Sequence, residues 1–105
     1  MLPRQEIRSA VRWHVQIRAE SGLRTFGYIV DLSTGGCCIA VENKPPRLGS
    51  KVIVRPDGID GLEATVQWIN GRQFGAIFAR PIYGPVLEHF VRKHSTFASL
   101  VTFGV

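Results

Sequence analysis

Strict alternation of apolar and polar residues over residues 11–18 is the feature that most limits how this chain can fold. The apolar positions are Val11, Trp13, Val15 and Ile17, and the polar positions are Arg12, His14, Gln16 and Arg18. Successive side chains of a β-strand point to opposite faces, so this pattern predicts a strand with one face buried and the other in solvent. The chain must therefore build a sheet that covers the apolar side of this segment.

Further short segments along the chain have the composition of strands, and turn-forming residues separate them. The predicted strands are residues 26–30, 37–41, 51–55, 62–69 and 74–78. The Pro56-Asp57-Gly58 segment has the chemistry of a turn. Asn70-Gly71 is a strong hairpin signal, because both residues tolerate the positive φ of a type I′ turn. The pattern is typical of a small antiparallel barrel or sandwich.

The periodicity changes after Gly84. Over residues 85–94 the apolar residues Val86, Leu87, Phe90 and Val91 fall on one face of a helix. Pro85 suits the first helical turn, and the basic residues at 92–94 complement the negative end of the helix dipole. Residues 97–105 are apolar; they could extend the helix, add a strand or dock on the barrel. We expect one domain over residues 1–105, with a flexible arm at 1–12, a barrel at 11–80 and a helix at 84–95.

Composition excludes several classes of protein. The chain of 105 residues carries a net charge of +5, and its hydrophobic fraction of 45% is that of a globular domain. It has no apolar run of membrane-spanning length and no signal-peptide pattern, so we expect a cytoplasmic protein without membrane insertion. Cys37 and Cys38 are neighbours in a predicted strand, so their side chains diverge and no disulfide is expected. The three histidines are scattered, and no metal site is predicted.

Two short motifs carry the functional information. Arg8 and Arg12 stand four residues apart, and residues 31–36 read Asp31-Leu-Ser33-Thr-Gly35-Gly36. Each motif has a simple structural explanation. Arginine pairs at this spacing are common in basic proteins, and a segment with Asp, Ser and two glycines can be a turn in which glycine adopts positive φ. Neither motif is specific alone.

Together, in this order and spacing, the motifs resemble the RxxxR and DxSxxG motifs of PilZ domains, which bind the bacterial second messenger cyclic di-GMP. The likeness extends over nearly the whole chain. In the expected order it includes Leu48-Gly49, Val66-Gln-Trp68, Asn70-Gly71 and Phe74-Gly75-Ala-Ile-Phe78. The resemblance implies a mostly β fold: a six-stranded antiparallel β-barrel with a C-terminal α-helix and an arginine-bearing N-terminal arm.

The same resemblance implies a binding set of Arg8, Arg12, Asp31, Ser33 and Gly36, with cyclic di-GMP as the ligand and no cofactor. An arginine fork can pair with guanine O6 and N7 or with a phosphate, and the Asp31 carboxylate can accept guanine N–H groups or orient an arginine. Ser33 would bond to phosphate or base, and a side chain at Gly36 would obstruct the ligand. Arg4, Gly35 and Trp68 are additional candidates, although core packing is favoured for Trp68, as for Trp13.

One departure from the family pattern leaves the ligand stoichiometry open. Many PilZ domains have a basic residue directly before the first arginine, associated with gripping a stacked ligand dimer, and this chain has Ile7 there. Two alternatives are open: Arg4 replaces that basic residue, or the ligand binds as one molecule. Arg4 with Arg8 is also a second frame for the motif. We prefer Arg8 and Arg12 because Arg12 adjoins Trp13 at the first strand.

We expect a receptor rather than an enzyme, because no paired carboxylates, metal cluster or nucleophile context exists. Its output would be a changed surface for a protein partner that controls motility, exopolysaccharide or biofilm formation. The main alternative is a protein-interaction module of the same fold that binds no nucleotide. Binding of DNA or RNA is not expected, because most aromatic residues fall at core positions and basic residues concentrate on the arm.

Overall fold

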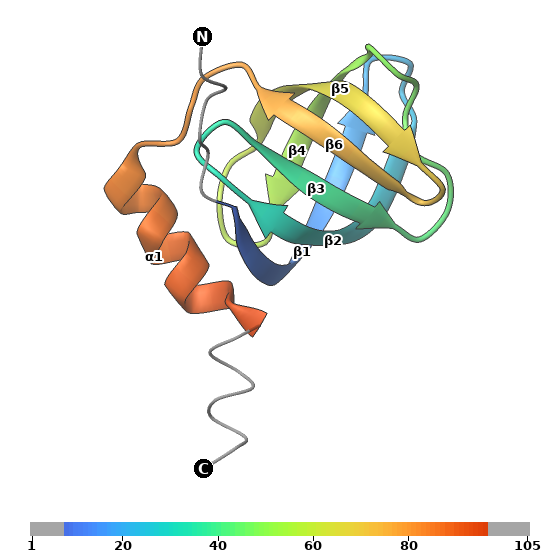
Figure 1. The fold of residues 1–105 in the computed structure, drawn as a ribbon. Coiled ribbons are helices and arrows are strands. Elements are labelled where there is room, and N and C mark those ends of the chain that lie inside the picture. Colours follow the sequence, from blue (N-terminus) through green and yellow to red (C-terminus); the bar gives the residue numbers. More distant parts are fainter. Residues whose placement is uncertain (1–7, 97–105) are drawn as a thin grey trace, which may run out of the picture.

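The chain forms a closed six-stranded barrel with one helix beside it (Figure 1). The structure is a computed structural model that describes residues 8–96. The elements are β1 (Ser9–Ala19), β2 (Arg24–Leu32), β3 (Gly36–Val41), β4 (Lys51–Pro56), β5 (Leu62–Asn70), β6 (Gln73–Phe78) and α1 (Gly84–His94). All six pairings are antiparallel, in the order β1-β2-β3-β6-β5-β4 around the barrel. The predicted fold class is confirmed.

Residues 1–7, including Arg4, and residues 97–105 lie outside the described part, as do the alternatives considered for the tail. Within the described part, β1 begins at Ser9. Residues 9–12 of the predicted arm therefore belong to β1, in which Ser9 and Ala10 pair with β2, and Arg8 directly precedes the first strand.

Alternation along the strands builds the core. The inward side chains of β1, including Val15 and Ile17, are fully buried, as the sequence pattern predicts. Aliphatic residues of β2 and β3 and the ring of Phe74 on β6 meet them inside the barrel. Burying such side chains stabilises the fold by roughly 1.5–3 kcal/mol each. The buried interior thus fixes the register of every strand, because a shift of one residue would turn its apolar set outward.

Three β-bulges interrupt this regular alternation. They lie between Ala10 and Trp13 on β1, between Ile29 and Asp31 on β2, and between Val66 and Trp68 on β5. The third makes the core prediction for Trp68 wrong: its side chain is 37% exposed on the outer face. An extra residue in the strand reverses the inward and outward phase beyond it, which strict alternation from Val66 does not anticipate.

The β5–β6 hairpin is confirmed, but its turn differs from the predicted one. Asn70 still pairs with Gln73, so Gly71 and Arg72 are the two turn residues. Gly71 has φ of 63°, and no non-glycine residue in the described part has positive φ. A glycine with positive φ at the first turn position is typical of a type II′ turn rather than type I′. The strand extends one residue further than predicted, which moves the glycine into the first position.

Helix α1 rests on the start of β1 through aromatic contacts. The Trp13 ring, which is 4% exposed, stacks on His94 at 4.2 Å between centroids and lies 5.0 Å from Phe90. Its Nε1–H donates to the carbonyl oxygen of Asp57 at 3.0 Å, so its predicted core position is confirmed. Burial against the barrel, aided by Lys93, lowers the pKa of His94.

The predicted helical face is correct for three of its four residues. Leu87, Phe90 and Val91 pack against the core, whereas Val86 is 43% exposed. Because α1 contacts the barrel mainly through β1, its apolar contact stripe is narrow, and Val86 lies at its edge.

The backbones of β2 and β3 approach each other closely at Gly27. A Cβ on Gly27 would overlap the backbone carbonyl of Ala40, and a backbone neighbour cannot swing aside. We expect Gly27→Ala to lower the free energy of unfolding by about 1–3 kcal/mol, measured by urea denaturation. Gly84→Ala is the matched control, because a Cβ there meets nothing within 4 Å. Equal stability of the two variants would contradict this account.

Candidate functional site

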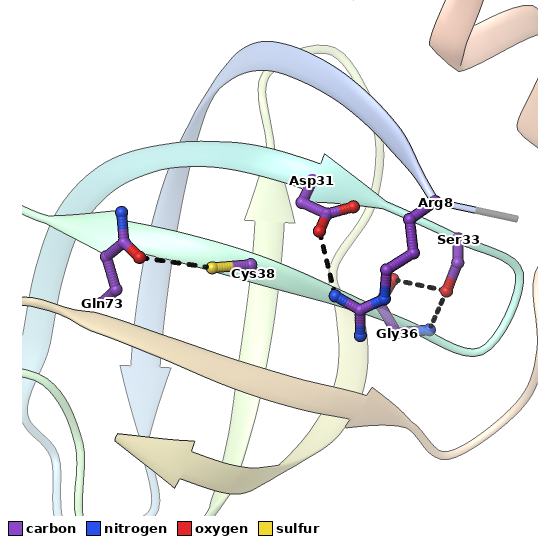
Figure 2. Close-up of polar contacts among 6 residues, drawn as sticks. All are labelled: Arg8, Asp31, Ser33, Gly36, Cys38 and Gln73. Carbon is purple, nitrogen blue, oxygen red and sulfur yellow. Dashed lines mark hydrogen bonds and ion pairs between the residues drawn. The ribbon is translucent and has the colours of Figure 1, made fainter. Parts of the chain in front are cut away.

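The turn between β2 and β3 is organised by Ser33. Its backbone N–H donates to the carbonyl oxygen of Gly36 at 2.9 Å, and its hydroxyl accepts from the Gly36 N–H at 3.2 Å. The hydroxyl also donates to that carbonyl oxygen at 3.3 Å. Ser33 is 1% exposed, so in this structure it holds the turn closed (Figure 2). Its predicted bond to a ligand stays a prediction.

The glycines of this turn serve a different purpose from the one predicted. Neither Gly35 nor Gly36 has positive φ, so that part of the turn prediction is wrong. A Cβ on Gly36 would overlap the carbonyl oxygen of Ala76 on β6. Glycine is required here because the β3 and β6 backbones approach closely. Obstruction of a ligand by a side chain at this position is a separate prediction.

Arg8 and Asp31 are brought together as the motifs predict. An Nη1–H of Arg8 donates to Asp31 Oδ2 at 2.9 Å, and Figure 2 shows the Arg8 side chain extending toward the carboxylate. The pair is largely open to water, with side-chain exposures of 52% and 29%. Such surface ion pairs contribute only about 0–1 kcal/mol, so another anion or donor could replace either partner at little cost.

The second oxygen of the Asp31 carboxylate has no matching donor. Oδ1 is buried and forms no hydrogen bond with any residue of the part that the structure describes. Leaving a buried acceptor unsatisfied costs roughly 1–3 kcal/mol, more for a charged group. Buried polar atoms of this kind are uncommon in folded proteins and call for an explanation.

A groove of about 540 Å³ opens beside this ion pair, on the outer face of β3, β6 and β5. Arg8 and the turn residues Gly35 and Gly36 line it from one side, and Trp68 lines it from β5. A Cβ on Gly75 would overlap the Trp68 indole, so the absence of a side chain there lets the indole lie against β6. The volume lies within the range of small-molecule sites, about 300–1,000 Å³.

Arg12 does not line this groove. Its guanidinium lies over the Tyr28 ring, 4.2 Å from the ring centroid, on the outer faces of β1 and β2. Tyr28 stands three residues before Asp31 on β2. The Arg12 side chain, which comes from β1, therefore lies over the strand that carries the Asp31 carboxylate. Of the predicted residues, Arg8, Gly35, Gly36 and Trp68 line the groove, and Asp31 is joined to it through its ion pair with Arg8. The structure places Ser33 beneath the turn and Arg12 on Tyr28.

Two cysteine thiols lie on β3, the strand that pairs with the Asp31 segment of β2, and they point to opposite sides of β3 as predicted. Cys37 faces the core, while Cys38 pairs across the ladder with Asp31 and approaches Gln73 Oε1 at 3.9 Å (Figure 2). Both cysteines are free. Burial raises the pKa of the Cys37 thiol to about 12, with Cys38 and Asp31 adding to the effect. Burial and then Asp31 also raise the pKa of Cys38, whereas Arg8 lowers it.

Residues 8–96 lack two further features, a cluster of metal ligands and a membrane-spanning helix. They contain no group of three or more histidine, cysteine, aspartate or glutamate side chains that could hold a metal ion. No described helix has the length and apolar character required to cross a bilayer.

Comparison with known proteins places the chain in a family. The chain matches the PilZ domain family over residues 3–92 and belongs to that family. No curated protein shows a significant match to its sequence.

Solved structures share its fold at low sequence identity. The PilZ domain of YcgR from Escherichia coli, solved with c-di-GMP, has a TM-score of 0.72 and 14% identity, over 99% of this chain and 100% of that one. The PilZ domain of CeSA from a cellulose-synthesizing bacterium has a TM-score of 0.61 and 22% identity, over 83% and 92%. The Bacillus subtilis inhibitor of motility, MotI/DgrA, has a TM-score of 0.58 and 21% identity, over 89% of this chain but 52% of that one.

The thiols provide a test of the site's electrostatics. We expect both cysteines of the folded protein to react slowly with a disulfide reagent at pH 8, because only the thiolate attacks and both pKa values are raised. In a Cys37→Ala background the rate at Cys38 should rise as the pH increases above 9. Adding Arg8→Ala should slow it further at a given pH, because a cation that favours the thiolate is lost. A rate unchanged by Arg8→Ala would contradict the geometry of this corner.

Proposed function

We propose that the protein is a cyclic di-GMP receptor whose groove beside Asp31 binds one guanine and the adjoining phosphate of the ligand. The observation that carries this proposal is the Asp31 carboxylate, whose Oδ1 is buried without a partner and whose Oδ2 pairs with Arg8, a cation of the groove lining. Guanine presents N1–H and N2–H₂ donors on one edge, which match a carboxylate in geometry and polarity. The family of the chain and the c-di-GMP in the YcgR structure support the same ligand.

Arg8 has the position and chemistry to serve the ligand's other groups. It lines the groove and its ion pair with Asp31 is weak, so its guanidinium can turn to a phosphate or to guanine O6 and N7. Breaking this pair leaves the Asp31 carboxylate available to the guanine donors. The ion pair therefore holds both groups ready before the ligand arrives.

Arg12 would join the site by leaving Tyr28. A cation over an aromatic ring at a protein surface contributes about 0.5–1 kcal/mol, which two charge-assisted hydrogen bonds to a phosphate exceed. Recruitment of Arg12 and ordering of the arm onto the groove would change the outer surface at the start of β1. This change is the signal that a protein partner in motility, exopolysaccharide or biofilm control would read, and no catalytic step is needed.

A calorimetric titration with cyclic di-GMP tests the proposal, with cyclic di-AMP and GMP as controls. We expect saturable binding of cyclic di-GMP alone, and a loss of at least about tenfold in affinity for each of Arg8→Ala, Arg12→Ala and Asp31→Ala. Arg47→Ala, at an exposed site away from the groove, is the matched control and should bind normally. If no binding is detected at high micromolar ligand, the receptor proposal is wrong, and the result favours a protein-interaction module that binds no nucleotide.

Trp68 gives a second test of where the ligand lies. A guanine in the groove can stack on its exposed indole, and stacking of a base on an aromatic ring is worth about 1–3 kcal/mol. We expect Trp68→Ala to weaken binding about fivefold or more, and ligand to quench the Trp68 fluorescence in a Trp13→Phe background. Ile69→Ala, at an exposed neighbour outside the groove lining, serves as control. Unaltered affinity and fluorescence would place the guanine elsewhere.

A further inference from the structure

The barrel face opposite the proposed nucleotide groove carries a second, basic groove. The nucleotide groove is centred on β6, and β1 is the strand farthest from β6 in either direction around the barrel. On the outer faces of β2, β1 and β4 lie Arg18, Arg24, Lys51 and Arg55, here called the basic face. No residue of the basic face belongs to the proposed nucleotide site.

The strand register concentrates these positive charges. Arg18 lies directly opposite Arg24 in the β1–β2 ladder and opposite Ile53 in the β1–β4 ladder. Arg55 lies opposite Gln16, one step further along the face. Like charges directly opposite one another in a sheet are destabilising. The fold therefore maintains an unfavourable cluster of guanidinium groups at this point.

No carboxylate of the described residues forms an ion pair with the cluster. Within residues 8–96 the ion pairs are those of Arg8 with Asp31 and of His14 with Asp57, and no residue of the basic face takes part in either. All four of its members are exposed. Their donors are free for an external anion.

The surface at the basic face is hollowed into a groove of three neighbouring hollows. A hollow of about 610 Å³ is lined by Arg18, Arg24 and Lys51, and another of about 600 Å³ by Arg55 and Phe26. A smaller hollow shares Arg18 and Arg24 with the first and Arg55 with the second. An extended segment could lie across all three strands in this groove.

We propose that the basic face is a docking site for a segment of a partner protein that carries carboxylates at its centre. The charge along the groove favours a protein over a nucleic acid. Arginines occupy the middle, whereas acidic residues line both outer hollows, with Glu20 and Glu63 at one end and Asp57 and Asp60 at the other. A nucleic acid carries uniform negative charge and would be repelled at both ends, while a peptide can vary its charge along its length.

The apolar and aromatic groups around the basic face suit the same occupant. Phe26 is 45% exposed and Leu23 is 41% exposed, and both lie on or beside β2. Arginine and aromatic residues are enriched in protein interfaces and supply many of their energetic hot spots. The Tyr28 ring is less available for stacking with a base, because the Arg12 guanidinium lies over it. Arginine forks that bind carboxylates in pairs would give the contact its specificity.

Fluorescence anisotropy with three labelled probes tests the proposal on the full chain. The probes are a peptide with glutamates at its centre, a peptide of the same composition with the glutamates moved to its ends, and an oligothymidylate. We expect the first to bind at least about tenfold more tightly than the others. The Arg18→Glu/Arg24→Glu double variant should abolish that preference. The Arg47→Glu/Arg80→Glu variant changes the net charge equally at exposed sites elsewhere and should keep it.

Other outcomes would overturn the proposal. Equal weakening of peptide binding by the two double variants would show long-range electrostatic attraction only. Tighter binding of oligothymidylate than of the peptides would show a nucleic-acid surface. If none of the three probes binds, the basic face is not a docking site. Amide chemical shifts should move at Arg18, Arg24 and Ile53 when the first peptide is added, and not at Gly36 or Gly75. Folding of the variants is checked by thermal unfolding, and cyclic di-GMP titration is recorded separately, so failure of one proposal does not imply failure of the other.

Discussion

Closure of the sheet is the constraint on which the rest of the structure depends. In a closed barrel every strand has two partners, so no free edge remains to absorb irregularity. Irregularity therefore concentrates where the backbone can accept it: at three bulges and at glycines such as Gly27 and Gly36, whose backbones approach a neighbouring strand closely. These places decide which side chains face outward. The functional surface is in this sense a consequence of how the barrel closes.

The candidate nucleotide site illustrates the point. The bulge in β2 lies between Ile29 and Asp31, directly before the carboxylate that pairs with Arg8. The bulge in β5 turns Trp68 outward, and Gly75 gives its indole room to lie against β6. Two local departures from regular pairing thus bring a carboxylate and an aromatic ring to one groove. A regular ladder would have sent the Trp68 side chain into the core.

The sequence is informative where periodicity is regular and less so where it breaks. Alternation in β1 predicts its buried face correctly, and the motifs predict the meeting of Arg8 with Asp31. Alternation in β5 predicts the wrong face for Trp68, because a single sequence does not reveal the bulge between Val66 and Trp68. Turn chemistry predicts the β5–β6 hairpin but not which residues form its turn. The basic face was missed because its arginines are distant in sequence, and only the register of three strands brings them together.

The rigidity of the barrel also limits how the two faces could communicate. Strands paired on both sides resist displacement, so a ligand at the nucleotide groove would act on elements at the rim rather than on the ladders. The start of β1 is such a place: Arg8 precedes it, Arg12 rests on Tyr28, and Val11 forms an isolated bridge to Ser95 at the end of α1. The same strand ends in the basic face at Arg18. A nucleotide that recruits Arg8 and Arg12 would therefore change the support of α1 first, while the register that holds Arg18 opposite Arg24 stays intact.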